Sequence, residues 1–197
     1  MLTISGSLRE QSFNLHLLRA AESLAPAGVS FDHYCGLGEL PHFSEDLEGE
    51  LTPSAVQEFR DRIKAANCVL ISTPEYNGGI PGSLKNALDW GSRPTGEGAF
   101  KDKPTAAIGA SPGRYGAQRS QADVRKVLTA MGAEILDTEL PVPAVHERFD
   151  DAGTLQDEEI SSRLTELVGA LIALTGEPLP ETADSAEYSL ACQRLAA

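Results

Sequence analysis

Hydrophobic positions along the chain alternate between short continuous runs and longer segments with helical spacing. The continuous runs are typical of strands that are covered on both faces. They predict strands at residues 2–5, 29–34, 68–73, 104–111 and 134–138. Apolar residues three or four positions apart predict helices at residues 15–24, 54–66, 118–131 and 157–174, and a further helix after Pro81.

The order of these elements, strand then helix about five times over, predicts a parallel sheet with helices on both faces. Right-handed crossovers restrict such a sheet to a doubly wound α/β/α sandwich of three layers. A five-stranded parallel sheet favours the flavodoxin-like order 2-1-3-4-5 over a six-stranded Rossmann sheet. Ligands of such sheets bind beyond the carboxyl ends of the strands, where the winding direction changes.

A length of 197 residues is enough for one domain with a sizeable core. We expect this domain at residues 1–175, because neither a linker nor an internal repeat divides that stretch. Residues 176–197 form an acidic, proline-broken C-terminal tail, which is either disordered or folded over a neighbour.

The charge of the chain excludes some partners. Sixteen Lys and Arg against 29 Asp and Glu give a formal net charge of −13, which disfavours nucleic acid and anionic membranes. The chain begins without a basic segment followed by an apolar one, and no apolar run approaches a membrane span, so we expect a cytoplasmic protein. Neither the three cysteines nor the four histidines have metal-site spacing, so we expect no structural metal.

The loop after the first strand, "SGSLREQSFN" at residues 5–14 (loop 1), is rich in short hydrogen-bond donors. Backbone amides and the helix dipole at such a position favour an anion, typically phosphate. Arg9 adds a fixed positive charge. The plainer interpretation is a turn in which Ser12 only caps the helix. Neither GxGxxG nor the P-loop pattern is present. The short donors are Ser5, Ser7, Ser12 and Asn14.

The second loop, residues 74–79 (loop 2), belongs to the stretch "TPEYNGGIPGSLKNALDW". Pro74 stiffens the exit from the strand, and Gly78 lets backbone amides approach a flat ligand closely. Tyr76 could stack on that ligand, while Glu75 and Asn77 could hold the loop or bond the polar edge of the ligand. The alternative is a loop that only changes the direction of the chain.

The third loop, "ASPGRYGAQRS" at residues 110–120 (loop 3), also follows a buried strand. Ser111 and its glycines offer another surface for close approach, and Arg114 and Arg119 add positive charge in an acidic protein. For either arginine, a solvated side chain is the alternative. Because the three strands are expected near the centre of the sheet, the loops should converge. Together they predict a mononucleotide with a flat ring, and FMN is the best candidate.

The motifs "SGSLRxxSxN", "TPEYNxxxPGxLKNAxDW" and "SPGRxG", in this order, resemble the flavodoxin-like NAD(P)H-dependent FMN reductases, a group that includes quinone, chromate and azo-dye reductases. The resemblance extends to about Leu174. It implies non-covalent FMN with its phosphate on loop 1 and its ring against loop 2, beside loop 3. The residues carried over are Ser5, Ser7, Arg9, Ser12, Phe13, Asn14, Pro74, Glu75, Tyr76, Asn77, Gly78 and Ser111.

The resemblance also implies a homodimer or homotetramer in which a neighbouring subunit helps to close the flavin site. With only five residues before the Gly6-Ser7 turn, the first strand is expected to be shorter than is usual in that family.

Flavin carries its own redox chemistry, so no catalytic side chain is expected. Hydride would pass from NADH or NADPH to FMN, and two electrons would then reach a quinone, a flavin, an azo compound or chromate. Because both substrates use one flavin face, we expect ping-pong kinetics. An FMN electron carrier without nicotinamide turnover and a flavin-free interaction domain are the alternatives. The sequence leaves open the physiological acceptor and the choice between NADH and NADPH.

Overall fold

The strands of the central sheet follow the order β2-β1-β3-β4-β5, and every neighbouring pair is parallel. This is the predicted flavodoxin-like order. The computed structural model describes residues 1–176, so the predicted C-terminal tail lies outside the described residues apart from Gly176. The strands are β1 (Leu2–Ser5), β2 (Asp32–Tyr34), β3 (Val69–Thr73), β4 (Pro104–Ala110) and β5 (Glu134–Ile135).

The predicted fifth strand is present as the short β5, and a sixth strand beyond it corrects the expectation of a five-stranded sheet. β5 pairs with the start of β4, and β6 (Pro141–Val142) pairs with its end, through Gly109 and Ala110. Between them the chain leaves the sheet, and the side-chain oxygen of Gln121 accepts a hydrogen bond from the Leu140 N–H (3.2 Å). The described sheet therefore has six strands.

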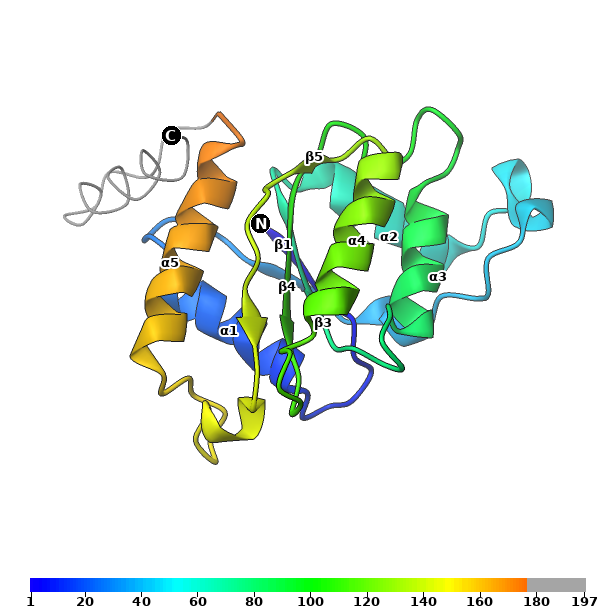
Figure 1. Ribbon diagram of the computed structural model, residues 1–197. Coiled ribbons are helices and arrows are strands. Elements are labelled where there is room, and N and C mark those ends of the chain that lie inside the picture. Colours follow the sequence, from blue (N-terminus) through cyan, green and yellow to red (C-terminus); the bar gives the residue numbers. More distant parts are fainter. Residues whose placement is uncertain (177–197) are drawn as a thin grey trace.

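Helices cover both faces of the sheet, which makes the three-layer sandwich (Figure 1). The four helices predicted with bounds lie within two residues of them, and the helix expected after Pro81 is α3. One face carries α1 (Phe13–Leu24) and α5 (Glu158–Ala173), and the other carries α2 (Ser54–Ala65), α3 (Gly82–Gly91) and α4 (Gln118–Ala130). Short 3₁₀ helices are η1 (Gly36–Gly38), η2 (Glu45–Leu47), η3 (Gly49–Leu51) and η4 (Val145–Glu147).

Two hydrophobic clusters, one on each side of the sheet, hold the layers together. Along β3, Val69 and Ile71 belong to the cluster under α2, α3 and α4, whereas Leu70 between them belongs to the cluster under α1 and α5. Successive side chains of a strand point to opposite faces, so both faces of β3 are covered. Every residue of β3 and β4 is buried, which explains the continuous apolar runs of the sequence.

Within residues 1–176, no helix is long and apolar enough to cross a membrane, and no group of three or more His, Cys, Asp and Glu side chains could hold a metal ion.

The packing of loop 3 against β6 predicts the cost of adding one methyl group. Gly116 has φ +55°, and a Cβ there would lie 2.5 Å from the Val142 nitrogen. At Gly96, φ is +82° but a Cβ would meet nothing within 4 Å. We expect Gly116→Ala to lower the free energy of unfolding by about 2 kcal/mol more than Gly96→Ala, because only the former adds overpacking to backbone strain. If urea unfolding gave equal losses of unfolding free energy for the two variants, the backbone near Gly116 would have to accommodate the methyl group without a free-energy cost.

Candidate functional site

The three candidate loops lie side by side at one edge of the sheet. They follow β1, β3 and β4, which are parallel neighbours, so their carboxyl ends meet at the same edge (Figure 1). In loop 1, the Gly6 N–H donates to the Ser72 carbonyl (2.8 Å), and a Cβ on Gly6 would lie 3.3 Å from Pro74 Cδ. Loops 1 and 2 are therefore in direct contact, as their predicted convergence requires.

Asn14 connects loop 1 with the ends of both neighbouring strands. Its Nδ2 donates to the Ala110 carbonyl (3.1 Å), and its Oδ1 accepts from the Ala110 N–H (3.0 Å) and the Ser72 hydroxyl (2.8 Å). Only 3% of the residue is exposed. The side chain predicted as a ligand donor thus has protein partners at both ends, and it positions loop 1 against β3 and β4.

The start of α1 has the features of an anion site. Ser12 is the N-cap, as the plainer interpretation expects, and its hydroxyl accepts the Asn14 N–H (3.2 Å). Among residues 1–176, no group accepts a hydrogen bond from the N–H of Gln11 or Phe13. Arg9 is exposed, and no carboxylate of the described residues pairs with it. Free N–H groups at a helix N-terminus beside an unpaired cation suit a phosphate.

The two serines at the start of loop 1 shape its backbone. The Ser5 hydroxyl oxygen accepts the Ser7 N–H (3.4 Å), and the Ser7 hydroxyl oxygen accepts the Arg9 N–H (3.3 Å). Both residues are partly exposed, so each hydroxyl combines a structural contact with access to solvent.

Loop 2 contains a tight turn at Asn77-Gly78. Tyr76 and Gly79 exchange both backbone hydrogen bonds (3.2 and 3.1 Å), and the two residues between them have φ values of +54° and +79°. Positive φ at both central positions is typical of the type I′ hairpin turn that Asn-Gly favours, although no strands extend from it here. Among the described residues, nothing accepts the N–H of Asn77 or Gly78, and the Tyr76 side chain is half-exposed.

Glu75 holds loop 2 to the start of α4. That helix begins after Ala117, which has a left-handed conformation and offers no capping side chain. The Glu75 carboxylate accepts the N–H groups of Arg119 (3.1 Å) and Ser120 (3.4 Å) in its place. Of the two roles expected for Glu75, the structure therefore gives it the holding role. The Thr73 and Ser120 hydroxyls are also bonded (2.8 Å).

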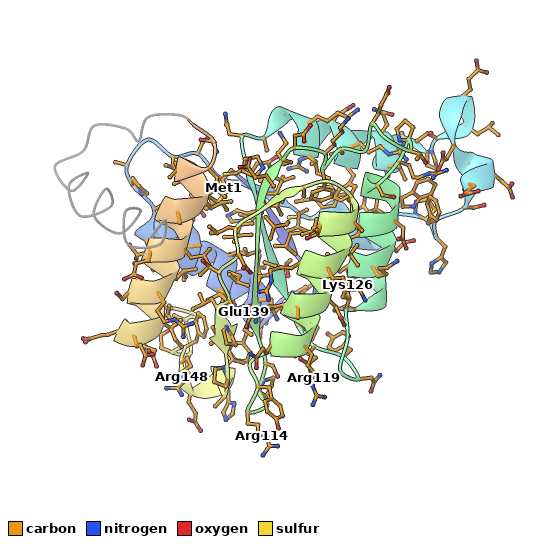
Figure 2. All side chains as sticks on the ribbon, turned by 45° about the horizontal axis from the view of Figure 1, so that its top comes forward. Met1, Arg114, Arg119, Lys126, Glu139 and Arg148 are labelled. Carbon is orange, nitrogen blue, oxygen red and sulfur yellow. The ribbon has the colours of Figure 1, made fainter. Side chains whose placement is uncertain are left out.

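Loop 3 is anchored at its base and carries cations at its tip. The Ser111 N–H donates to the Val142 carbonyl (3.1 Å), and the Ser111 hydroxyl accepts the Gly113 N–H (3.0 Å). At the tip, the exposed Tyr115 ring lies 4.5 Å from the Arg114 guanidinium and 5.5 Å from that of Arg119. Figure 2 shows both arginines at the same end of the molecule.

Known proteins share the sequence and the fold of this chain. Residues 1–147 match the family described as NADPH-dependent FMN reductase. The chain belongs to the NADPH-dependent FMN reductase family. This membership confirms the resemblance and the enzyme class predicted from the sequence, with FMN as cofactor and NAD(P)H as co-substrate.

Relatives of the reductase share most of its length. An NAD(P)H-dependent FMN reductase of Pseudomonas aeruginosa is 38% identical over 172 residues, 87% of this chain and 92% of the relative. A quinone reductase of Pseudomonas putida is 38% identical over 79% of this chain and 83% of its own. The solved structure of FerB, a flavoenzyme NAD(P)H:(acceptor) oxidoreductase from Paracoccus denitrificans, superposes with a TM-score of 0.78 at 34% identity, over 89% and 96% of the two chains.

An aromatic cluster packs around the first turn of α1, next to loop 1 of the reductase. The ring of Phe13, a predicted site residue, packs against His16 and Phe149 (centroids 5.9 and 5.8 Å apart), and its backbone N–H has no acceptor among the described residues. Burial, and to a smaller extent the charge of Arg19, lower the pKa of His16. The structure leaves its Nδ1 buried and without a hydrogen-bond partner among the described residues.

The sequence alone did not indicate that Ser72, His16 and Phe149 contact the residues that form the start of α1. In the sequence, Ser72 is only one more residue of a predicted buried strand. Its hydroxyl donates a hydrogen bond to Asn14, which lies 58 positions away in the sequence. Nothing in the local pattern marks such a contact.

The cap that Glu75 provides predicts a double effect of its removal. We expect Glu75→Ala to lower the free energy of unfolding by about 1 kcal/mol, because two N–H groups of α4 lose their acceptor. FMN affinity should fall with it, because loop 2 loses its attachment to α4. Glu97→Ala is the control, since Glu97 is exposed and no described residue bonds its carboxylate. Denaturant unfolding and flavin fluorescence titration measure both effects, and an unchanged stability would contradict the capping role.

The lowered pKa of His16 predicts a loss of stability in mild acid. Because the folded pKa lies below the unfolded value of 6.5, the unfolded state binds more protons between the two values. Stability should therefore fall as the pH drops from about 7.5 through this window. His16→Phe, which cannot titrate, should show a smaller difference in melting temperature between pH 7.5 and pH 5.5. An equal pH dependence in both proteins would exclude His16 as its source.

Proposed function

We propose that this reductase reduces quinones with NAD(P)H through an FMN held non-covalently between loops 1, 2 and 3. The observation that carries the proposal is the pair of unpaired N–H groups at Gln11 and Phe13 beside the unpaired Arg9, next to a turn with two further free N–H groups. The acidic surface repels anions in general, so such a local site is what an anionic cofactor requires.

The residues divide into two groups according to the part of FMN that they would hold. The start of α1 would take the phosphate, because it combines a helix N-terminus with Arg9. The free N–H groups of Asn77 and Gly78 would donate to the polar edge of the ring, with Tyr76 beside it. The phosphate group is Ser5, Ser7, Arg9, Ser12, Phe13 and Asn14, and the ring group is Pro74, Glu75, Tyr76, Asn77, Gly78 and Ser111.

Bound FMN supplies hydride acceptance and two-electron transfer, so the protein needs no acid, base or nucleophile of its own. The loops would orient the ring and leave one face open. NAD(P)H and the acceptor would use that face in turn, which predicts ping-pong kinetics. A quinone reductase among the relatives makes quinones the first acceptors to test, and azo compounds, chromate and free flavin follow.

The test is a visible spectrum of the purified protein with FMN, recorded before and after anaerobic NADPH and again after a quinone. Bleaching by NADPH and recovery with the quinone are expected. A bound flavin that NADPH leaves oxidised would instead identify an electron carrier. A protein that retains no flavin would overturn the assignment of all three loops.

The assignment of Arg9 predicts an effect on binding rather than on chemistry. Because a charge-assisted hydrogen bond to the phosphate is lost, we expect Arg9→Ala to raise the Kd for FMN about tenfold or more. The rate at which NADPH reduces the remaining bound flavin should stay close to that of the parent. Lys101→Ala is the control, because Lys101 is exposed and precedes β4 at the opposite edge of the sheet. Equal FMN affinity in parent and Arg9→Ala would remove Arg9 from the phosphate site.

A further inference from the structure

We propose that Arg114 and Arg119 bind the phosphates of the nicotinamide co-substrate, and that Arg114 makes the enzyme prefer NADPH to NADH. The inference rests on the proposed function, because the co-substrate must reach a flavin held between the loops. NADPH differs from NADH by a 2′-phosphate on its adenosine. A preference therefore needs a cation placed for that one group.

The first observation is that both guanidinium groups lie against one exposed tyrosine. Arg114 stacks over the Tyr115 ring and donates from Nη2 to the Tyr115 hydroxyl, and Arg119 lies on the same ring at 5.5 Å. Neither arginine forms an ion pair with a carboxylate among residues 1–176. Two exposed arginines on one ring, without an acid paired to either, form a local patch of positive charge in a chain of net charge −13.

The second observation is where this arginine pair lies. Arg119 Nη1 is 3.7 Å from the position of a Cβ built on Gly78, so its guanidinium adjoins the turn proposed for the flavin ring. On the other side, Arg114 and Tyr115 line a cleft of about 320 Å³. The pair thus lies between the proposed ring site and a cleft, which is the path that an extended dinucleotide would follow.

The cleft has walls suited to an adenosine. Tyr115 forms one side, and Pro141, Pro143 and Ile160 add apolar surface from β6, the segment after it and α5. A flat base can stack on such aromatic and apolar surface. Figure 2 shows Arg148 at the same end of the molecule as the arginine pair.

The other cations of the cleft have partners within the protein, and one acid of its lining remains without a described partner. Arg148 is paired with Asp157 (2.8 Å), and Arg163 donates to the Glu139 carbonyl (3.0 Å). Glu159 is the remaining acid of the lining, at the first turn of α5. Arg114 is therefore the cation of the cleft with neither a carboxylate nor a carbonyl partner among the described residues.

These positions assign different phosphates to the two arginines. Arg119, beside the ring site, would bind the pyrophosphate that NADH and NADPH share. Arg114, at the cleft, would bind the 2′-phosphate that only NADPH carries, and its planar fork suits that group. The two substitutions should therefore differ in which co-substrate they affect.

The experiment compares Arg114→Ala, Arg114→Lys and Arg119→Ala with the parent, and uses Lys126→Ala as the matched control. Lys126 is an exposed cation on α4, two turns beyond Arg119, and no described residue pairs with it. With FMN-loaded protein and a quinone, kcat/KM is measured for NADPH and NADH. Separately, calorimetry measures binding of 2′,5′-ADP and 5′-AMP, which differ only in the 2′-phosphate and need no turnover.

We expect the parent to prefer NADPH and to bind 2′,5′-ADP more tightly than 5′-AMP. Arg114→Ala should lose about tenfold or more in kcat/KM for NADPH and in 2′,5′-ADP affinity, with NADH and 5′-AMP within about twofold. Arg114→Lys should recover part of the kcat/KM for NADPH and part of the affinity for 2′,5′-ADP. Arg119→Ala should weaken NADPH and NADH alike, and Lys126→Ala neither.

Equal losses for both co-substrates in Arg114→Ala, or unchanged 2′,5′-ADP binding, would overturn the assignment of Arg114. A parent that oxidises NADH and NADPH equally well would overturn the inference while leaving the proposed function intact. A parent that oxidises neither would instead defeat the proposed function itself.

Discussion

One buried carboxamide sets the geometry on which the candidate site depends. The side chain of Asn14 both donates to and accepts from the backbone of Ala110, as a neighbouring strand would. It also accepts the Ser72 hydroxyl, so it joins the beginning of α1 to the ends of β3 and β4. Buried polar groups are expensive to leave unpaired, so this arrangement has a strong preference for a single geometry. The spacing between loops 1, 2 and 3 follows from it.

The residues of the family motifs therefore have two kinds of task. The side chains of Asn14 and Glu75 form hydrogen bonds within the protein. Asn14 bonds to the end of a neighbouring strand, and Glu75 bonds to the start of α4. Arg9, Asn77 and Gly78 keep a cation or an N–H group without a protein partner among the described residues. A site built in this way is ordered before any ligand arrives, which reduces the entropy lost on binding.

The sequence predicted the strand order well because the relevant signals are local. Continuous apolar runs mark strands covered on both faces, and the alternation with helices leaves few topologies. β6 was not predicted, because two residues carry no periodic pattern and only their pairing with Gly109 and Ala110 makes Pro141 and Val142 a strand. That pairing depends on contacts made after the chain has folded.

The sequence predicted which loops form the candidate site, but it did not predict the hydrogen bonds and side-chain contacts within that site. The role of Glu75 depends on α4 lacking a cap of its own, which concerns residues more than 40 positions away. Likewise, the sequence places Arg114 and Arg119 in one loop without indicating that both would share the ring of Tyr115. Such long-range and side-chain relations have no periodic signal in the sequence.

The short strands at the two sides of the sheet have a consequence for the behaviour of the protein in concentrated solution. β2 has three residues, and β5 and β6 have two each. An edge strand with many unpaired backbone groups would offer a template to another sheet, and short or proline-containing edges offer little. Pro141 cannot donate from its backbone nitrogen at all. The interruption between β5 and β6 therefore leaves no long run of unpaired strand backbone at this side of the described sheet for another sheet to pair with.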